Sequence, residues 1–216
     1  SNTLSWRWVA GLQTVGKTYL ATSENIARFT NGRFAPKGLA TVATIPTEMP
    51  VCAAQPLPKV AYFDAQTPAF LLLTPEDLHP ESLLGASTKI NGAGMLFDPE
   101  TLGGENARAF VAGAVHDAAE RVGNNFKCPA HVLNNLDGAS LIAQARETGA
   151  KQIITAYAPV GPVADALARI APSLVSAGIP LVHIRRAWDE RFWPHATKGF
   201  FPFKERIPKI LQDMGI

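Results

Sequence analysis

Short apolar runs alternate with amphipathic stretches from Ala69 onward, and this alternation restricts the possible folds more than any other feature. The apolar runs are too short for helices and predict strands at Ala69–Leu73, 94–97, 131–133, 152–157 and 180–184. The stretches between the later strands have helical periodicity and predict helices at 106–122, 138–148 and 162–178. Because strand-helix-strand units with short joints form right-handed crossovers, the sequence predicts an α/β fold with a parallel sheet flanked by helices.

Residues that start and stop helices stand at the ends of these stretches. Gly123 is expected to end the first helix, and Asp137 is expected to cap the second. Pro162 opens the third, which runs to Gly178, and Pro172 is expected to bend or split it. Ligands of such folds bind at the carboxyl ends of the strands, so a site is expected at that edge.

Composition divides the chain into three parts. Residues 35–58 lie in a stretch with proline and glycine and no sustained period, which is typical of a linker. Residues 59–216 hold the predicted sheet, and residues 1–34 form a separate segment whose best helix start is Ser23. We therefore expect one α/β domain preceded by a linker and a short helical N-terminal segment.

Charge and hydropathy limit the kinds of partner. Only 18% of the residues are charged, against about 25% in an average protein, and 47% are hydrophobic. So few charges favour a protein that packs against more protein, and a net charge of +2 is too small to indicate a nucleic-acid surface. No apolar run approaches the roughly 20 residues that span a bilayer, so we expect a cytoplasmic protein without membrane contact.

Neither the cysteines nor the histidines predict a metal site. Cys52 and Cys128 stand in unrelated contexts, which also argues against a disulfide. We interpret both as buried or partly buried thiols. The histidines share no metal-ligand spacing; they are His79, His116, His131, His183 and His195.

The octapeptide from Gly11 to Thr18 has the phosphate-loop pattern Gly-x-x-x-x-Gly-Lys-Thr. In such a loop Lys17 reaches the terminal phosphates and Thr18 holds magnesium, and the strand before Asp98 could supply the acidic residue. The motif should run directly into a helix, but the best helix start lies five residues later, at Ser23. A phosphate-loop nucleotide-binding protein is therefore the alternative rather than the preferred interpretation.

The N-terminal segment carries a more specific pattern. A Trp-x-Trp pair at Trp6 and Trp8 is followed by Ala-Gly, which ends at Gly11, and then by Asn-Ile-x-x-Phe-Thr at 25–30. The segment resembles the last part of the flavin-binding helical domain of the DNA photolyase and cryptochrome family, where these motifs recur in this order. The resemblance implies an FAD flavoprotein.

The α/β part resembles the antenna domain of the same family. From residue 131 to 207 the order is a strand, Asp137 at a helix start, Thr-Gly-Ala at 148–150, a long helix, a strand and a tail with Phe-Pro-Phe at 201–203. Upstream, the strand Ala69–Leu73 and the loop after it resemble the family's first strand and loop. The resemblance implies a Rossmann-like antenna domain.

The two resemblances come in the reverse of the family's usual order. This order implies a rearranged relative whose flavin domain lies mostly upstream of Ser1, so that the chain is a C-terminal fragment. The parent would act in light-driven DNA repair, as a lyase, or in photoreception. The expected partners are the upstream flavin-binding domain and, in the parent, damaged DNA, while the fragment itself would be inactive and would not retain FAD. A third interpretation is a non-catalytic α/β interaction module that docks on the flavin domain.

The resemblance assigns roles to three residues. Trp6 corresponds to the flavin-proximal member of the electron-relay tryptophans, and Trp8 is its neighbour. Asn2 falls where photolyases often have an asparagine that faces the flavin, so Asn2 and Trp6 are the expected cofactor-binding residues. On their own, the tryptophans could equally be large core side chains, and Ser1 and Asn2 could be remnants of an expression tag.

The loop after the first predicted strand departs from the family. The family's first loop usually has arginines around its aspartate, whereas this chain has Pro75, Glu76 and His79, so binding of an antenna cofactor is not implied.

The run 185–193 combines arginines with Trp188 and Trp193. It could bind single-stranded nucleic acid, but packing of the C-terminal tail is the preferred interpretation.

Overall fold

The protein is described from a computed structural model, which covers residues 12, 19–44, 47, 56–60, 62–85, 87–197 and 199–216. The chain forms two compact units. One comprises Ser1–Pro56 with Lys198–Glu205, and the other comprises Leu57–Thr197 with Arg206–Ile216. The second unit contains the sheet and is called the α/β unit here.

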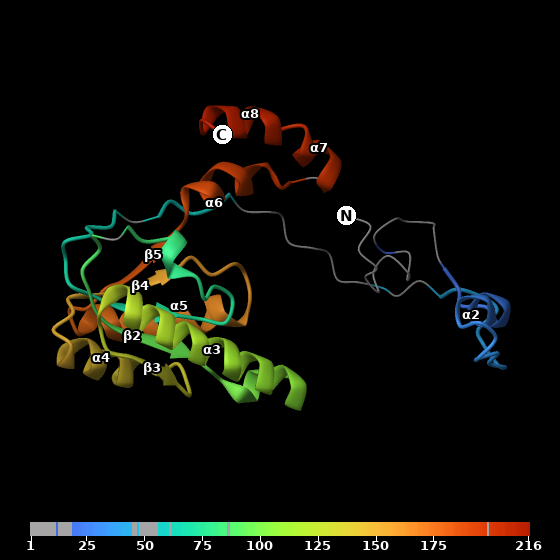
Figure 1. The fold of residues 1–216 in the computed structure, drawn as a ribbon, viewed down its shortest axis with the longest axis horizontal. Coiled ribbons are helices and arrows are strands. Elements are labelled where there is room, and N and C mark those ends of the chain that lie inside the picture. Colours follow the sequence, from blue (N-terminus) through green and yellow to red (C-terminus); the bar gives the residue numbers. More distant parts are fainter. Residues whose placement is uncertain are drawn as a thin grey trace. The chain divides into compact units, whose positions relative to one another are not determined.

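The sheet of the α/β unit has five parallel strands in the order β3-β2-β1-β4-β5 (Figure 1). The strands are β1 (Ala69–Leu73), β2 (Ile90–Leu96), β3 (Ala130–Leu133), β4 (Gln152–Ala156) and β5 (Leu181–Ile184). This is the strand order of the Rossmann-like doubly wound folds. The predicted α/β fold with a parallel sheet flanked by helices is therefore confirmed.

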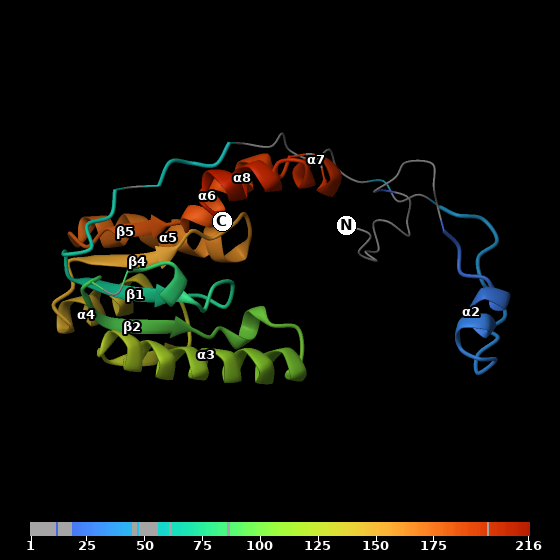
Figure 2. The same ribbon diagram turned by 45° about the horizontal axis from the view of Figure 1, so that its top comes forward.

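Helices follow the strands as the sequence predicts. The longer ones are α3 (Glu105–Phe126), α4 (Gly138–Glu147) and α5 (Pro162–Ser176), and two short ones after β5 are α6 (Ala187–Phe192) and α8 (Ile207–Asp213). Single turns of 3-10 helix occur at Pro80–Ser82, Pro99–Thr101 and Trp193–His195. The N-terminal part of α3 extends beyond the carboxyl ends of the strands in both views (Figure 2).

The core consists of two apolar layers, one on each face of the sheet. On one face, α3 packs Val115, Ala118 and Val122 against the strands. On the other face α4 contributes Leu141 and α5 contributes Leu167, with further residues from each helix. All five residues of β1 are buried because this strand is central and covered on both faces.

Three features differ clearly from the expectation. Helix α3 does not end at Gly123 but continues to Phe126, where Lys127 adopts the left-handed conformation with φ of 53°. The helix continues past Gly123 because Phe126 packs, partly buried, against the core. Pro172 does not split α5, which is continuous. Strand β2 starts at Ile90, earlier than expected, since the polar Asn91 interrupts its apolar run.

The other unit contains two short helices in its described residues, α2 (Ser23–Phe29) and α7 (Phe200–Lys204). The helix start expected at Ser23 is confirmed, because the Thr22 hydroxyl accepts a hydrogen bond of 3.1 Å from the backbone N–H of Asn25. No side chain of α2 is buried. In the interval 35–58, the described residues form neither helix nor strand.

Gly94 in β2 provides a test of this packing. A Cβ at Gly94 would lie 2.6 Å from Cδ1 of Leu133, closer than any normal contact. Gly94→Ala should therefore lower the free energy of unfolding by about 1–3 kcal/mol in urea titrations followed by circular dichroism. Gly113→Ala is the control, because Gly113 is exposed on α3 with nothing within 4 Å, and alanine should stabilise the helix by roughly 0.5–1 kcal/mol. An unchanged midpoint for Gly94→Ala would contradict the packing.

Candidate functional site

The carboxyl edge of the sheet is where this fold places a site. The chain passes from β1 to β2 on one side, while β4 pairs with β1 on the other, so the strand order reverses between β1 and β4. The crevice beyond such a reversal is the usual ligand position. The loop that follows β1, residues 74–79, occupies this position and has a hollow on either side. Glu76 lines both hollows.

The larger hollow lies toward β2 and is called the β2-side hollow. It has a volume of about 310 Å³ and is walled by apolar side chains from the end of β2, from the loops after β2 and β3 and from the start of α5, among them Leu96, Leu102, Leu136 and Val163. Three charged residues also line it, Glu76, Asp98 and Arg169. Asp98 already caps a 3-10 turn, because its carboxylate accepts a hydrogen bond of 3.1 Å from the Glu100 N–H. This hollow fits a small, mainly apolar ligand.

The smaller hollow lies toward β4, has a volume of about 220 Å³ and is called the β4-side hollow. An ion pair between Asp77, in the loop after β1, and Arg186, just after β5, forms part of its lining. Both terminal nitrogens of Arg186 donate hydrogen bonds to the Asp77 carboxylate, and the distance from Nη2 to Oδ1 is 2.9 Å. The same guanidinium donates to the His79 carbonyl oxygen at 2.7 Å and to the Ser82 hydroxyl at 2.6 Å. Arg186 therefore fixes the first loop to the end of β5.

A second arginine holds the same region from the opposite side. Arg121 of α3 donates to a Glu81 carboxylate oxygen at 2.6 Å and to the Leu78 carbonyl oxygen at 2.8 Å. It also pairs with Asp117 one turn earlier on α3, at 2.9 Å. The loop after β1 is thus anchored to the segment after β5 by one guanidinium and to α3 by the other.

The two adjacent acids of the loop have opposite electrostatic environments. Burial raises the pKa of Asp77, but the hydrogen bond from Arg186, the His79 N–H and the charges of Arg186 and His79 outweigh it, so that the pKa lies below its usual value. Glu76 is largely exposed, and partial burial of its carboxyl group raises its pKa. Asp77 therefore stays ionised as a structural partner, while Glu76 is the acid available to a ligand in either hollow.

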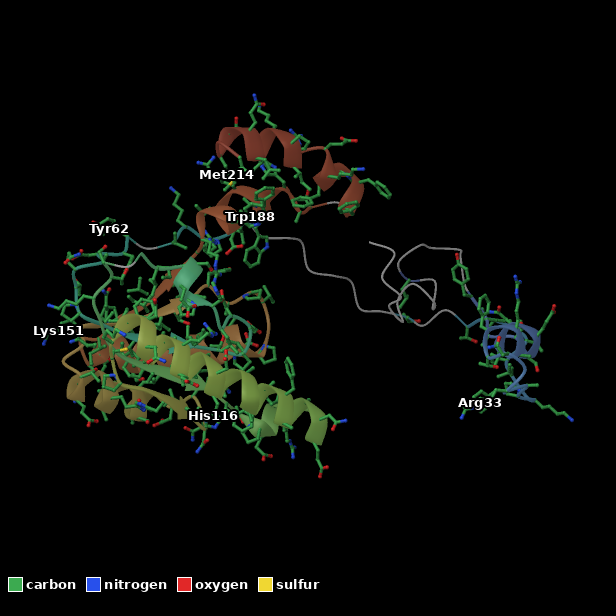
Figure 3. The ribbon with its side chains drawn as sticks, viewed as in Figure 1. Arg33, Tyr62, His116, Lys151, Trp188 and Met214 are labelled. Atoms are coloured by element: carbon green, nitrogen blue, oxygen red, sulfur yellow. The ribbon has the colours of Figure 1, made fainter. Side chains whose placement is uncertain are left out.

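The two arginines nearest β5 in the run 185–193 pack onto the α/β unit, whereas Arg191 is exposed. The side chain of Arg185 is only 3% exposed, pairs with Glu190 at 2.5 Å and stacks over Tyr157, 4.8 Å from the ring centre. Trp193 contacts the same tyrosine, with ring centres 5.7 Å apart. Trp188 remains half-exposed on α6 (Figure 3). Because both Arg185 and Arg186 are in ion pairs, the geometry favours tail packing over a surface for single-stranded nucleic acid.

The site residues expected from the sequence lie elsewhere in the chain. Asn2, Trp6 and Trp8 are outside the described residues, and so is the octapeptide from Gly11 to Thr18 apart from one residue, Leu12. The Asp77 to Arg186 pair was not predicted. A signal existed, because both residues follow strands of one parallel sheet and the carboxyl ends of such strands meet at one edge. Within the described ranges, no three His, Cys, Asp or Glu side chains gather closely enough to hold a metal ion.

We compared the chain with known protein families and with curated proteins. No family model matches it, and no curated protein is significantly similar. Among the described residues, no helix combines the length and apolar character needed to cross a bilayer.

The Asp77 to Arg186 pair makes stability depend on pH. The folded pKa of Asp77 is lowered, so its contribution is present above the unfolded pKa of about 3.9 and is lost as the pH falls through the folded value. A double-mutant cycle of Asp77→Asn and Arg186→Met, measured by urea unfolding, should give a coupling of about 1–3 kcal/mol at pH 7. This coupling should decline progressively below about pH 4.

Asp117→Asn is the matched control for the cycle. The Asp117 carboxylate is more exposed than that of Asp77 and pairs with Arg121 within one helix. Asp117→Asn should therefore lower the free energy of unfolding by less than about 0.5 kcal/mol. If Asp77→Asn and Asp117→Asn lowered the free energy of unfolding equally at pH 7, Arg186 would not anchor the loop.

Proposed function

We propose that the chain is the C-terminal part of a photolyase- or cryptochrome-like FAD flavoprotein. Residues 1–34 would complete a flavin-binding helical domain that lies upstream, and the α/β unit would be an antenna-like domain attached to it. The parent would use light absorbed by the flavin for DNA repair, as a lyase, or for photoreception. Its partners would be the upstream domain and, for repair, damaged DNA.

The main support is that the residues quoted for the antenna-like resemblance fall at the element boundaries of a Rossmann-like fold. Asp137 caps α4 by accepting a hydrogen bond of 2.8 Å from the Ser140 N–H. Gly149, after α4, and Gly178, after α5, adopt positive φ values of 70° and 74° that favour glycine. Each of these two glycines ends a helix shortly before the next parallel strand.

Helix α2 of the other unit points to further protein. Helix α2 has only seven residues and buries none of them, and the ring of Phe29 is 76% exposed. Isolated helices shorter than about 12 residues are marginal in water and depend on tertiary packing. A helix of this kind is expected where an upstream domain covers its apolar side chains.

The α/β unit does not fit FAD at its carboxyl edge. A dinucleotide site requires a glycine-rich turn after the first strand, so that the backbone can approach the pyrophosphate. Here that turn contains Pro75, Glu76 and Asp77, and carboxylates repel phosphate. The flavin is therefore assigned to the upstream domain, where Trp6, Trp8 and Asn2 would be near it.

The phosphate-loop alternative is less well supported. In that motif the Lys and Thr stand in the first turn of a helix that continues past them. Residues 19–22 are not helical, and Thr22 is extended and caps a helix that begins only at Ser23. Asp98, the acid expected to assist such a loop, already caps its own turn.

The first test is cofactor retention. The 216-residue chain, purified after expression in a flavin-rich host, should be colourless, and added FAD should separate from it on gel filtration. The reason is that the turn after β1 repels phosphate. Stoichiometric yellow protein would contradict the assignment of the flavin to the upstream domain.

The second test uses Trp6 in the intact parent. Trp6→Phe keeps an aromatic ring, so it should cost stability only on the order of 1 kcal/mol. Phenylalanine is much harder to oxidise than tryptophan, so photoreduction of the bound flavin under blue light should slow strongly while the flavin content stays unchanged. Trp188→Phe, at a half-exposed position on α6, is the matched control and should leave the rate unchanged. Wild-type photoreduction in flavin-loaded Trp6→Phe would show that Trp6 only packs.

A further inference from the structure

Glu81 lies in the 3-10 turn Pro80–Ser82, just after the loop that follows β1. One of its carboxylate oxygens, Oε1, accepts from Arg121 of α3 at 2.6 Å. The other, Oε2, is buried and has no hydrogen-bond partner in the part of the chain that the structure describes. The imidazole Nε2 of His79 lies 3.9 Å from this oxygen. Because buried polar atoms are nearly always paired, the state of this imidazole nitrogen decides whether Oε2 has a partner.

The contacts of the Ser82 hydroxyl assign the hydrogen on the His79 ring. Ser82 Oγ lies 2.6 Å from Nε of Arg186, 3.1 Å from the His79 carbonyl oxygen and 3.0 Å from Nδ1 of the same histidine. Arginine can only donate and a carbonyl oxygen can only accept, so the single hydroxyl hydrogen goes to the carbonyl oxygen. Ser82 Oγ then accepts from Nδ1, which places the ring hydrogen there. In neutral His79, Nε2 is therefore an acceptor.

Two acceptors thus face each other while His79 is neutral. Nε2 then carries a lone pair and Oε2 belongs to a carboxylate, so no hydrogen bond can join them. A proton taken up from solvent can bind the ring only at Nε2, because Nδ1 already carries its hydrogen. The added proton converts Nε2 into a charged donor beside the one carboxylate oxygen of Glu81 that lacks a partner.

The other charged groups in the contacts of this turn are carboxylates and guanidinium groups. They are Asp77, Glu81, Asp117, Arg121, Arg186 and Asp189. Side chains of these types ordinarily titrate outside the range from pH 5.5 to 8, whereas histidine is the side chain that ordinarily gains a charge within it. A change in this network over that range therefore originates at His79.

We propose that His79 and Glu81 form an acid-dependent latch that fastens the loop after β1 to α3. Protonated His79 donates from Nε2 to Oε2 of Glu81, while Oε1 of Glu81 remains bonded to Arg121 of α3. Neutral His79 leaves the connection open. Because the loop carries Glu76, which lines both hollows, the latch sets how firmly the wall of the hollows is held. This proposal does not depend on the proposed photolyase-like function.

The ring hydrogen of His79 is measured first, in the wild-type 216-residue chain. Two-dimensional NMR of the nitrogen-15-labelled imidazole rings at pH 8 should show the hydrogen on Nδ1. The spectrum of His79→Asn, which lacks these signals, assigns them. A hydrogen on Nε2 at pH 8 would overturn the proposal, because Nε2 could then donate to Glu81 without acid.

A double-mutant cycle of His79→Asn and Glu81→Gln measures the latch itself by urea unfolding. Asparagine keeps a donor near the position of Nδ1 and lacks Nε2. At pH 5.5 the coupling should change the unfolding equilibrium constant about two- to five-fold, the value of one exposed ion pair. At pH 8 the coupling should vanish, because the proton that makes the pair is lost as the pH rises. Titration of other groups and loss of the Arg121 contact cancel in the cycle.

His131→Asn combined with Glu81→Gln is the control cycle. His131 lies on β3, where its ring contacts the side chains of Gln144 and Phe70. It should not couple with Glu81 at either pH. Coupling between His79 and Glu81 that is equal at pH 5.5 and pH 8, absent at both, or matched by the His131 cycle would overturn the proposal.

Discussion

The complete burial of β1 is the constraint on which the rest of the structure depends. Its five residues are at most 1% exposed, and it pairs on one side with β2 and on the other with β4. A strand with both edges paired and both faces covered must be apolar throughout, as Ala69–Leu73 is. Polar side chains of this stretch can then appear only beyond its ends, which is why Thr74, Glu76 and Asp77 come together at the carboxyl edge.

Two arginines stabilise that edge by pairing with the acids that gather there. Arg186 neutralises Asp77 and binds two further oxygens, so most of its donors are used. A partly buried carboxylate without this partner would be costly, and the same burial raises the pKa of Glu76, which no arginine pairs with in the described contacts. The neighbouring acids therefore differ in role because only one of them meets a guanidinium.

The positions of the five strands and three long helices could be predicted from the sequence. The spacing of the apolar residues indicates which side chains are buried, and burial of these side chains determines the fold. The errors arose where a local signal was outweighed by packing. Gly123 lies inside α3, which continues until Phe126 has packed against the core, and Pro172 lies inside a continuous α5. The Asp77 to Arg186 pair was predictable in principle, since both follow parallel strands. Asn2, Trp6 and Trp8 remain predictions.

The turn after β1 differs from the corresponding turn of nucleotide-binding proteins with a doubly wound fold. In those proteins glycines leave room at the strand reversal for a pyrophosphate. Here the Asp77 N–H donates to the Thr74 carbonyl oxygen at 3.0 Å and the Asp77 carboxylate is paired with Arg186, so the turn is closed by its own protein groups and has no glycine. The crevice is reduced to two small hollows on either side of Glu76. In the proposed function, this domain would therefore adjoin the flavin-binding domain, and the flavin would be held there rather than at the strand reversal.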